Sequence, residues 1–423
     1  MILNHQSIGI NDLRIILPKS LLNVELIVEK RLAQDPQLEE HLNRAIKSTG
    51  QKSIRFPGSH EDSVTLACQA AYAILKNRPL QNLRFITVGT ETAVDHSKPI
   101  SAYVLGGLRK AGLDIPWSLS TFQTQHACAG GSLAMLTIAA FLQVASQKNE
   151  EGLVLSTDIA RYQTSTTAEI TQGAGASAVI LGKNPRLLEL DLASTGFYSN
   201  DVDDFFRPLG QETAEVKGRF SVQCYFQAFQ DAFKNYCQRK SLNEREALEG
   251  IDFFVLHTPF MKMAEQAMMN LLKRSAKMKD SEARSFLDSR DFYSAISPIA
   301  DIGNMYNSSI FLVLAATLWN GWQKLGKGIA GKKILFGSYG SGNTMAVFEG
   351  VIAPTAPDVI KTWNLSHTLN HQNSGSFEQY LAWIERSKNG RYPPVSNDLL
   401  IEAGNFYLKE IREDGYREYD FKS

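Results

Sequence analysis

Short apolar runs recur along the chain, and each one ends abruptly in small or polar residues. They lie at residues 84–88, 152–155, 252–256 and 333–336. A continuously apolar run of this length is typical of a strand whose sheet is covered on both faces. Patterns with helical spacing lie between the runs, at residues 62–76, 128–147, 221–239 and 308–323. Strands that alternate with helices predict an α/β fold with buried, largely parallel strands.

The carboxyl ends of the predicted strands carry reactive side chains. Glu91, Asp158, His257 and Ser341 each follow one of the apolar runs directly or within a few residues. In α/β folds, ligands gather outside the carboxyl ends of the strands. Packing alone does not require such residues there, so the pattern predicts a functional site at this edge of the sheet.

Two polar stretches interrupt the pattern, at residues 274–290 and 366–400. The first is strongly charged and predicts a solvated helix or loop. The second contains Ser, Asn, Gly and a Pro-Pro pair, and predicts a surface excursion before a final strand at 404–412. No short repeat is evident, and a similarity between the two halves cannot be demonstrated from the sequence.

The longest apolar segments, near residues 132–146 and 310–319, are interrupted or flanked by polar residues. Neither reaches the roughly 18–20 apolar residues that span a bilayer, so we expect buried core helices and no membrane association. The first residues lack the basic start and apolar stretch of a signal peptide. These features predict a soluble protein.

Composition and charge narrow the function classes further. The chain has 423 residues, 43% of them hydrophobic, and its 44 basic side chains balance 44 acidic ones. Zero net charge argues against a polyelectrolyte binder of nucleic acid or anionic membranes. Four widely spaced cysteines fit neither a disulfide framework nor a metal site, and the histidines show no metal-ligand spacing. A reducing cytoplasm is the expected location.

The sharpest local motif surrounds Cys128, in the run Gln125–Ser132 (QHACAGGS), which precedes an almost wholly apolar helix. A cysteine at or just before a helix N-terminus lies near unpaired N–H groups and the positive end of the helix dipole. Both favour the thiolate, which predicts a nucleophile. The alternative is a small buried hydrophobic residue, the common fate of a lone cysteine. Cys128 alone does not decide between these interpretations.

The other candidates are also open to two interpretations. Burial beside apolar neighbours would raise the pKa of Glu91 toward a range useful for acid–base chemistry, although most glutamates are solvated. His257 ends a very apolar strand and is either catalytic or a hydrogen-bonded core histidine. Asp158 either orients a base or caps the next segment. The donor-rich turn 337–343 suits a carbonyl or a phosphate but does not match a P-loop or a dinucleotide fingerprint.

Seven motifs taken together resemble the hydroxymethylglutaryl-CoA synthase family of the thiolase superfamily. They are, in chain order, GTE, ACAGGS, TDIARY, SVQCY, HTPF-x-K, GN-x-Y and SYGSG. The resemblance extends from near residue 61 to the closing FYLKEIREDGYREY. It implies a thiolase-like, five-layered αβαβα core of two fused, similar halves, which we divide as residues 1–185 and 186–423. It also implies a homodimer.

The resemblance implies a role for several residues. Cys128 matches the nucleophile that accepts an acetyl group from acetyl-CoA, Glu91 the general acid/base, and His257 the residue that binds the carbonyl of acetoacetyl-CoA. The product would be 3-hydroxy-3-methylglutaryl-CoA, a precursor of mevalonate and isoprenoids, made without a metal or other cofactor. The remaining matches bind CoA or the substrate, or are acidic residues that support the site: Lys262, Ser221, Asn304, Ser341, Thr171, Asp158 and Asp204.

Three departures from the family pattern leave the acceptor open. Ala129 replaces a common Tyr after the nucleophile, Gln266 stands where a second CoA-contacting Lys is common, and residues 163–170 differ from the substrate-contacting segment. A branch of the family acts on β-ketoacyl groups held by an acyl carrier protein in polyketide assembly, and it is the nearest alternative. An initiating ketoacyl synthase is more distant, because the GTE glutamate argues against it. A catalytically silent scaffold that keeps the fold is the alternative from another class.

Overall fold

A computed structural model describes residues 7–147, 149–388 and 401–423. Its centre is a nine-stranded mixed sheet with the order β11-β12-β13-β8-β1-β7-β6-β4-β5. The strands are β1 (Ile8–Ile16), β4 (Leu83–Gly89), β5 (Ser120–Thr124), β6 (Glu151–Ile159), β7 (Ala174–Lys183), β8 (Leu188–Ser199), β11 (Phe253–Leu256), β12 (Lys333–Gly340) and β13 (Thr344–Ile352). All four predicted strands are present.

The two sides of the sheet repeat one topology. On one side, β1 pairs antiparallel with β7, β7 antiparallel with β6, and β6 parallel with β4. On the other, β8 pairs antiparallel with β13, β13 antiparallel with β12, and β12 parallel with β11. The two sets meet only at β1 and β8, where Gly9 pairs with Glu189 and Ile10 with Leu188. This duplication could not be seen in the sequence.

The prediction of largely parallel strands is wrong. The parallel pairs are β4–β5, β4–β6 and β11–β12, and the other main-sheet pairs are antiparallel. The reason lies in β7 and β13, which follow β6 and β12 and run back beside them instead of crossing over through a helix. Both strands are buried along almost their whole length, so their apolar sequences do not distinguish the two directions.

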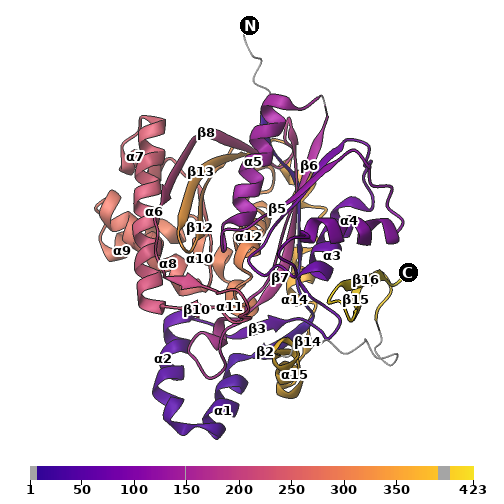
Figure 1. Cartoon of the computed structure of the whole chain (residues 1–423). Coiled ribbons are helices and arrows are strands. Elements are labelled where there is room, and N and C mark those ends of the chain that lie inside the picture. The colour runs from indigo at the N-terminus through magenta and orange to yellow at the C-terminus, as the bar shows by residue number, and fades with distance from the viewer. Residues whose placement is uncertain (1–6, 148, 389–400) are drawn as a thin grey trace.

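Helices cover both faces of each set of strands, which gives five layers (Figure 1). The outer layer on the first set contains α3 (Ser63–Leu75) and α4 (Ile100–Lys110). The central layer contains α5 (Gly130–Ala145) and α12 (Ser309–Leu325). The outer layer on the second set contains α6 (Gly218–Lys240) and α8 (Met261–Ser275). The αβαβα order is therefore the one predicted.

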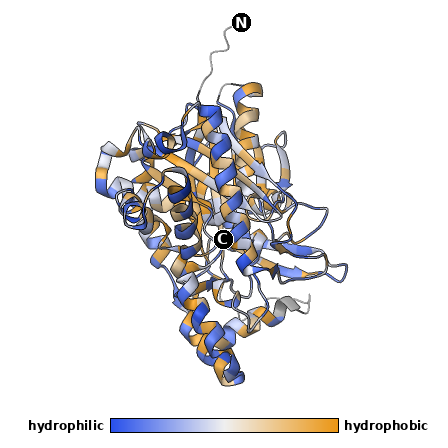
Figure 2. Ribbon diagram, turned by 90° about the vertical axis from the view of Figure 1, so that its left-hand side faces the viewer, coloured by the Kyte–Doolittle hydropathy of each residue, from blue (hydrophilic) through white to orange (hydrophobic). Residues whose placement is uncertain are grey.

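Alternating side chains of a strand fill different cores. In β6, Leu153 and Leu155 belong to the core beneath α3, whereas Val154 belongs to the core that includes α5. This is the two-residue period of a strand covered on both faces. Figure 2 shows hydrophobic residues gathered on the strands, behind helices that carry many hydrophilic residues.

Helix α5 has a composition that needs explanation. Residues Ala127–Ala145 form the one helix in the described part of the chain that is long and apolar enough to cross a membrane. Within the fold, 61% of its most apolar stretch is buried. Its place in the central layer, between two sets of strands, explains this composition, because a helix covered on most sides is apolar nearly all round.

The end of the chain packs back onto the first half. Helices α14 (Leu365–Asn370) and α15 (Phe377–Lys388) lie where the sequence predicted a surface excursion, and Tyr380 and Trp383 of α15 are buried. Residues 366–376 are mostly exposed, as predicted, but the prediction is wrong for α15, because its buried aromatic rings cover the first half; residues 389–400 lie outside the described part. The hairpin β15 (Phe406–Ile411) and β16 (Arg417–Phe421) packs against α3 and α4.

The remaining elements are short and mostly peripheral. The charged stretch 274–290 contains α9 (Asp280–Asp288), whose Ala283 and Leu287 are buried. The other helices are α1 (Val24–Gln34), α2 (Glu39–Thr49), α7 (Glu244–Glu249), α10 (Phe292–Ile296), α11 (Ile299–Ile302) and α13 (Ala356–Ile360), with the 3-10 turns η1 (Pro36–Leu38), η2 (Glu169–Thr171), η3 (Tyr306–Ser308) and η4 (Gly326–Ile329). The other strands are β2 (Ser20–Asn23), β3 (Ser53–Phe56), β9 (Phe205–Phe206), β10 (Glu215–Val216) and β14 (Asn373–Ser374).

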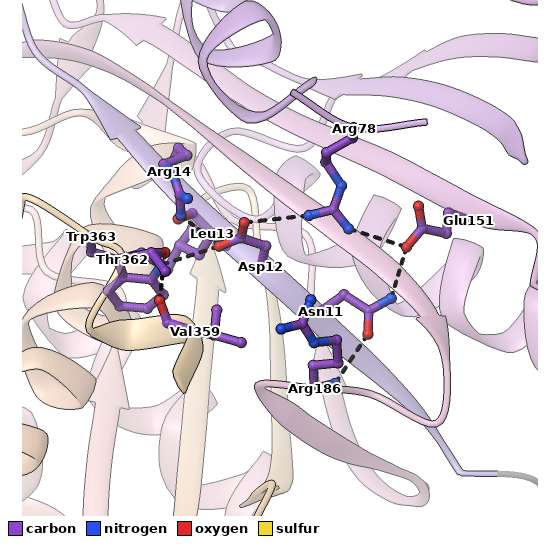
Figure 3. Close-up of polar contacts among 10 residues, drawn as sticks. All are labelled: Asn11, Asp12, Leu13, Arg14, Arg78, Glu151, Arg186, Val359, Thr362 and Trp363. Carbon is purple, nitrogen blue, oxygen red and sulfur yellow. Dashed lines mark hydrogen bonds and ion pairs between the residues drawn. The ribbon is translucent and has the colours of Figure 1, made fainter. Parts of the chain in front are cut away.

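A polar cluster fastens the sheet at the amino ends of its parallel strands (Figure 3). The Asp12 carboxylate of β1 accepts hydrogen bonds from Arg14 Nη1 at 2.5 Å and Trp363 Nε1 at 3.1 Å, and lies 3.4 Å from Arg78 Nη1. Arg78 also reaches the Glu151 carboxylate of β6 at 3.3 Å. Every charge here has an opposite partner, so the cluster joins β1, β6 and the segment after β13 without leaving a reactive group.

Candidate active site

The predicted reactive residues lie at one edge of the main sheet. Glu91 follows β4, Asp158 lies near the end of β6, Cys128 immediately precedes the first residues of α5, and His257 follows β11. Gly340, at the end of β12, touches the nucleophile turn: a Cβ there would lie 2.4 Å from the His126 carbonyl oxygen. The carboxyl ends of both strand sets therefore meet around Cys128.

Asp158 organises the strand end that carries Glu91. Its fully buried Oδ1 accepts hydrogen bonds from Glu91 N at 2.8 Å, Thr92 N at 3.0 Å and Thr92 Oγ1 at 2.8 Å, and from Thr90 Oγ1 at 3.0 Å. Burial raises the pKa of Asp158, while hydrogen bonds led by Asn307 lower it. The bonds fix three successive residues of the GTET segment, so Asp158 holds the backbone of Glu91 in place.

Asn307 joins this carboxylate to the nucleophile turn. Its backbone N–H and its Nδ2 both donate to Asp158 Oδ2, at 3.0 Å and 2.8 Å. The same Nδ2 donates to the Ala127 carbonyl at 2.8 Å, and its Oδ1 accepts from Gly131 N at 2.7 Å. Ala127 has a φ of +39°, a conformation uncommon for a residue with a side chain. One buried amide of the second half therefore fixes both flanks of Cys128.

The environment of Cys128 contradicts the predicted thiolate. Its side chain is buried against Tyr162, Ala214 and Tyr306. Burial raises the pKa of the thiol well above its ordinary value, and the nearby Asp158, Glu91 and Asp204 carboxylates raise it further. The start of α5 is close, as predicted, but burial and the acidic neighbours act in the opposite direction to its dipole. The resting sulfur is therefore a thiol that must lose its proton as it reacts.

Glu91 has the properties of a general acid/base. Its side chain is buried, and burial raises its pKa to about 8, with the Arg207 guanidinium lowering it and Asp158 raising it. Oε1 accepts a hydrogen bond from Arg207 Nε at 3.1 Å, whereas Oε2 is buried without a hydrogen-bond partner. A carboxyl group with this pKa can accept a proton and return it near neutral pH.

His257 is held by its backbone, which leaves the ring available. Its N–H donates to the Gly337 carbonyl at 2.8 Å, and its carbonyl accepts from the Tyr225 hydroxyl at 2.9 Å. Nδ1 is buried without a hydrogen-bond partner, and burial lowers the pKa of the imidazole to about 3. A neutral ring can donate one hydrogen bond to a carbonyl, which suits the predicted role.

Asp204 is the centre of a second polar group, beside the turn after β12. Its Oδ2 accepts hydrogen bonds from Tyr339 at 2.8 Å and Ser221 Oγ at 3.2 Å, and its Oδ1 from Gly342 N at 2.9 Å. Asp204 also acts electrostatically on Cys128. The predicted residues Asp204 and Ser221 are therefore together, and they support the turn that carries the half-buried Ser341.

The other predicted contacts lie at different distances from this centre. Asn304 donates from Nδ2 to the Tyr162 hydroxyl at 3.3 Å, so it lies in the wall behind Cys128. Thr171 donates its hydroxyl to the Ala168 carbonyl at 2.8 Å within its own turn. Lys262 lies on the first turn of α8 and is paired with Glu265 at 2.9 Å rather than with any of the reactive residues. Substrate contacts of these residues stay predictions.

Four residues near the centre were given no role from the sequence. Asn307 clamps the nucleophile turn, Arg207 holds Glu91, and the rings of Tyr162 and Tyr306 cover Cys128. Both tyrosines belong to motifs that carry the family resemblance, TDIARY and GN-x-Y, which was a usable signal. Arg207 and Asn307 gave none, because each acts on residues more than a hundred positions away in the chain.

The divergent segment 163–170 is fixed by a buried ion pair. Arg31 of α1 donates to both oxygens of Glu169, and Tyr380 of α15 donates to Oε1 at 2.9 Å. A cavity of about 510 Å³ lies beside this segment, and Tyr162 belongs both to its lining and to the wall of Cys128. Among the described residues, no group of three His, Cys, Asp or Glu could hold a metal ion.

Two family models match this chain, and together they cover nearly its whole length. Residues 5–186 match the family model described as hydroxymethylglutaryl-coenzyme A synthase N terminal, and residues 188–296 and 281–422 match the corresponding C-terminal model. Fold and site together define a condensing enzyme with a thiolase-like fold. Since the two models cover nearly the whole sequence, the chain belongs to the hydroxymethylglutaryl-CoA synthase family.

Individual relatives are similar at low identity. The chain is 27% identical to a hydroxymethylglutaryl-CoA synthase of Haloferax volcanii, over 88% of this chain and 90% of the relative. It is 25% identical to the polyketide biosynthesis 3-hydroxy-3-methylglutaryl-ACP synthase PksG of Bacillus subtilis, over 78% of each. The solved structure of MvaS in complex with 3-hydroxy-3-methylglutaryl coenzyme A has a TM-score of 0.85 at 27% identity, over 99% of this chain and 100% of that one.

Proposed function

We propose that this enzyme condenses an acetyl group, carried on Cys128, with the ketone of acetoacetyl-CoA to give 3-hydroxy-3-methylglutaryl-CoA. The Cys128 sulfur displaces CoA from acetyl-CoA, and the thiol proton ends on the departing CoA. Glu91 removes a proton from the acetyl methyl group, and the resulting carbon adds to C3 of acetoacetyl-CoA. The new alkoxide takes a proton from Glu91, and water then cleaves the thioester of Cys128.

One observation carries this proposal: Asp158 binds the backbone of Glu91, and Asn307 binds both Asp158 and the turn that carries Cys128. Glu91 and Cys128 are close enough for their charges to interact, and Oε2 of Glu91 is buried without a hydrogen-bond partner. A general base must lie within reach of the proton that it removes, and its pKa must be near the working pH. The neutral His257 supplies a hydrogen bond for the acceptor carbonyl.

The direct test is incubation of the purified enzyme with acetyl-CoA and acetoacetyl-CoA. We expect release of one CoA thiol for each 3-hydroxy-3-methylglutaryl-CoA formed, both measured by mass spectrometry. With acetyl-CoA alone, an acetyl adduct should form on Cys128, and Cys128→Ser should abolish it. A folded protein that never gains the adduct contradicts the proposal and favours a scaffold that has kept only the fold.

A second candidate is condensation on a β-ketoacyl group held by an acyl carrier protein. Two observations support it: the carrier-protein synthase PksG is about as similar as the CoA-dependent relatives, and a cavity of about 510 Å³ adjoins Tyr162. A longer acyl chain needs such space, whereas an acetoacetyl group does not. An enzyme that forms the adduct, ignores acetoacetyl-CoA and condenses with carrier-bound substrate would establish this alternative.

Assembly, location and pathway stay predictions. We expect a homodimer in the cytoplasm that binds CoA thioesters and acts before mevalonate in isoprenoid synthesis. Analytical ultracentrifugation would measure whether the enzyme is a homodimer. The genes beside this one would address the pathway, since carrier proteins and mevalonate enzymes imply different reactions.

A further inference from the structure

Arg207 contacts the candidate base at two points. Its Nε donates to Glu91 Oε1 at 3.1 Å, and its Nη2 donates to the backbone carbonyl of the same residue. One guanidinium therefore holds both the side chain and the main chain of Glu91. The side chain of Arg207 is 22% exposed and that of Glu91 is 8% exposed, so solvent screens this pair only weakly.

The hairpin that carries Arg207 is fastened to the second half. Phe205 and Phe206 of β9 pair with Val216 and Glu215 of β10. The preceding Asp204 is bound by Tyr339, Ser221 and the backbone of the turn after β12, and the ring of Phe205 lies 5.8 Å from that of Tyr306. The backbone of Arg207 is therefore fixed to the second half, and its side chain extends to Glu91 in the first half.

The two oxygens of Glu91 differ because of this contact. Oε1 is occupied by Arg207, while Oε2 is buried and has no hydrogen-bond partner. Five charged or titratable groups from other segments interact with Glu91: Arg207, Asp158, Cys128, Tyr162 and Tyr306. Arg207 is the one cation among these groups, so it is the one that stabilises the ionised carboxylate.

We propose that Arg207 is a positioning residue that fixes Oε1 of Glu91 and thereby assigns proton transfer to Oε2. This inference rests on the proposed function of the same site. Oε2 takes a proton from the acetyl methyl group, so a C–H bond breaks and an O–H bond forms; the same proton later passes to the alkoxide of the product. Arg207 neither gives nor receives a proton in this cycle.

The geometry requires arginine and not just a positive charge. A planar guanidinium donates in fixed directions to two acceptors at once, whereas the ammonium of lysine is a compact point charge. Lysine at this position should therefore keep the electrostatic effect on Glu91 and lose the orientation of its carboxylate. Glutamine should lose both. The two variants separate the two parts of the proposed role.

The test compares Arg207→Gln and Arg207→Lys with Lys217→Gln as a matched control. Lys217 lies on the same hairpin, and its exposed ammonium pairs with Asp203 and not with Glu91. Condensation is measured against pH, and acetylation of Cys128 is measured separately. The ionisation of Glu91 is followed without substrate by the infrared band of its protonated carboxyl group, identified by its loss in Glu91→Gln.

Arg207→Gln should slow condensation at neutral pH about tenfold or more while Cys128 still becomes acetylated. Its infrared titration and the acid limb of its rate profile should move to higher pH, because the uncompensated carboxylate ionises less readily. Arg207→Lys should restore the titration but not the full rate, and Lys217→Gln should match the wild type.

An infrared titration and acid limb that stay at the wild-type pH in Arg207→Gln would overturn the inference. If the Gln variant does not fold, the Lys variant decides: a full wild-type rate then refutes the orienting role. Failure of the wild-type enzyme to condense would instead refute the proposed function, and the infrared titration would still test the contact between Arg207 and Glu91.

Discussion

The ion pairs Arg31–Glu169 and Arg207–Glu91 both contain a buried glutamate, but they are built differently. Glu169 accepts hydrogen bonds at both oxygens, from Arg31 Nε and Nη2, from the Tyr380 hydroxyl and from Ser165 N. Glu91 receives Arg207 at Oε1 only, and its Oε2 is buried without a hydrogen-bond partner. The first carboxylate is fully satisfied, whereas the second is left with one oxygen available for chemistry.

The number of hydrogen bonds to each carboxylate distinguishes an ion pair that stabilises the fold from one that we propose serves catalysis. A buried carboxylate with every lone pair occupied fixes its neighbours, here α1, α15 and the segment before η2. A buried carboxylate with one free oxygen costs stability, because that oxygen has lost its water and gained no donor. A protein retains such a loss of stability where its function requires it.

Glu91→Gln should produce the largest effect in this comparison. We expect condensation to fall about 10²–10⁴-fold, because an amide cannot take a proton from the acetyl methyl group. The amide oxygen still accepts from Arg207, so the fold and the acetylation of Cys128 should be retained. Product formation, the acetyl adduct and a thermal melt measure the three quantities. Normal condensation would remove Glu91 from the mechanism.

Glu169→Gln should act on stability instead. It leaves Arg31 as a buried charge without a counter-ion, so the free energy of unfolding in urea should fall by about 3–5 kcal/mol. The double variant Arg31→Met, Glu169→Leu is the control, since removing both charges should recover most of the loss. A loss as large in the double variant as in the single one would show that packing and not charge dominates at this site.

Asn307→Ala should moderately lower both the stability of the fold and the rate at which Cys128 is acetylated. The variant removes neutral hydrogen bonds to Asp158, the Ala127 carbonyl and Gly131 N, and we expect a loss of about 1–3 kcal/mol in unfolding free energy. Acetylation of Cys128 should slow as well, since its turn loses support on both flanks. Unfolding in urea and the rate of adduct formation measure these effects; an unchanged rate would separate the clamp from the nucleophile.

The most gradual effect, spread over several pH units, is a pH dependence of stability. Burial raises the pKa of Glu91 from an ordinary 4.5 to about 8, so between these values the folded state keeps a proton that the unfolded chain has lost. The wild type should therefore lose stability relative to Glu91→Gln as pH rises through this window, by at most about 1.4 kcal/mol per pH unit, with a constant gap above it. Unfolding curves of both proteins across the window measure this; an opposite trend would contradict the buried environment.

Strand ends and motifs were predictable from the sequence because their causes are local. The apolar runs that became β4, β6, β11 and β12 place Glu91, Asp158 and His257 at one edge, and the structure has them there. The strand directions were not predictable, because β7 and β13 are as apolar as parallel strands. The helix α15 was missed because the polar residues of its exposed face hide Tyr380 and Trp383.

Long-range contacts set the parts of the site that the sequence could not supply. A thiolate at Cys128 was expected from its nearness to a helix start, but Asp158, Glu91 and Asp204 come from distant segments and reverse that expectation. Arg207 lies in none of the seven motifs, and Asn307 directly follows the GN-x-Y motif without belonging to it. Their partners are visible only after the chain has folded.

The amide of Asn307 has a consequence for the history of the duplicated chain. Cys128 belongs to the first repeat, yet Asn307, which forms hydrogen bonds on both sides of its turn, belongs to the second. The first repeat alone would lack both of these hydrogen bonds to the turn of Cys128. Holding the turn in this way requires either two joined repeats, as here, or a second copy of a single repeat beside the first.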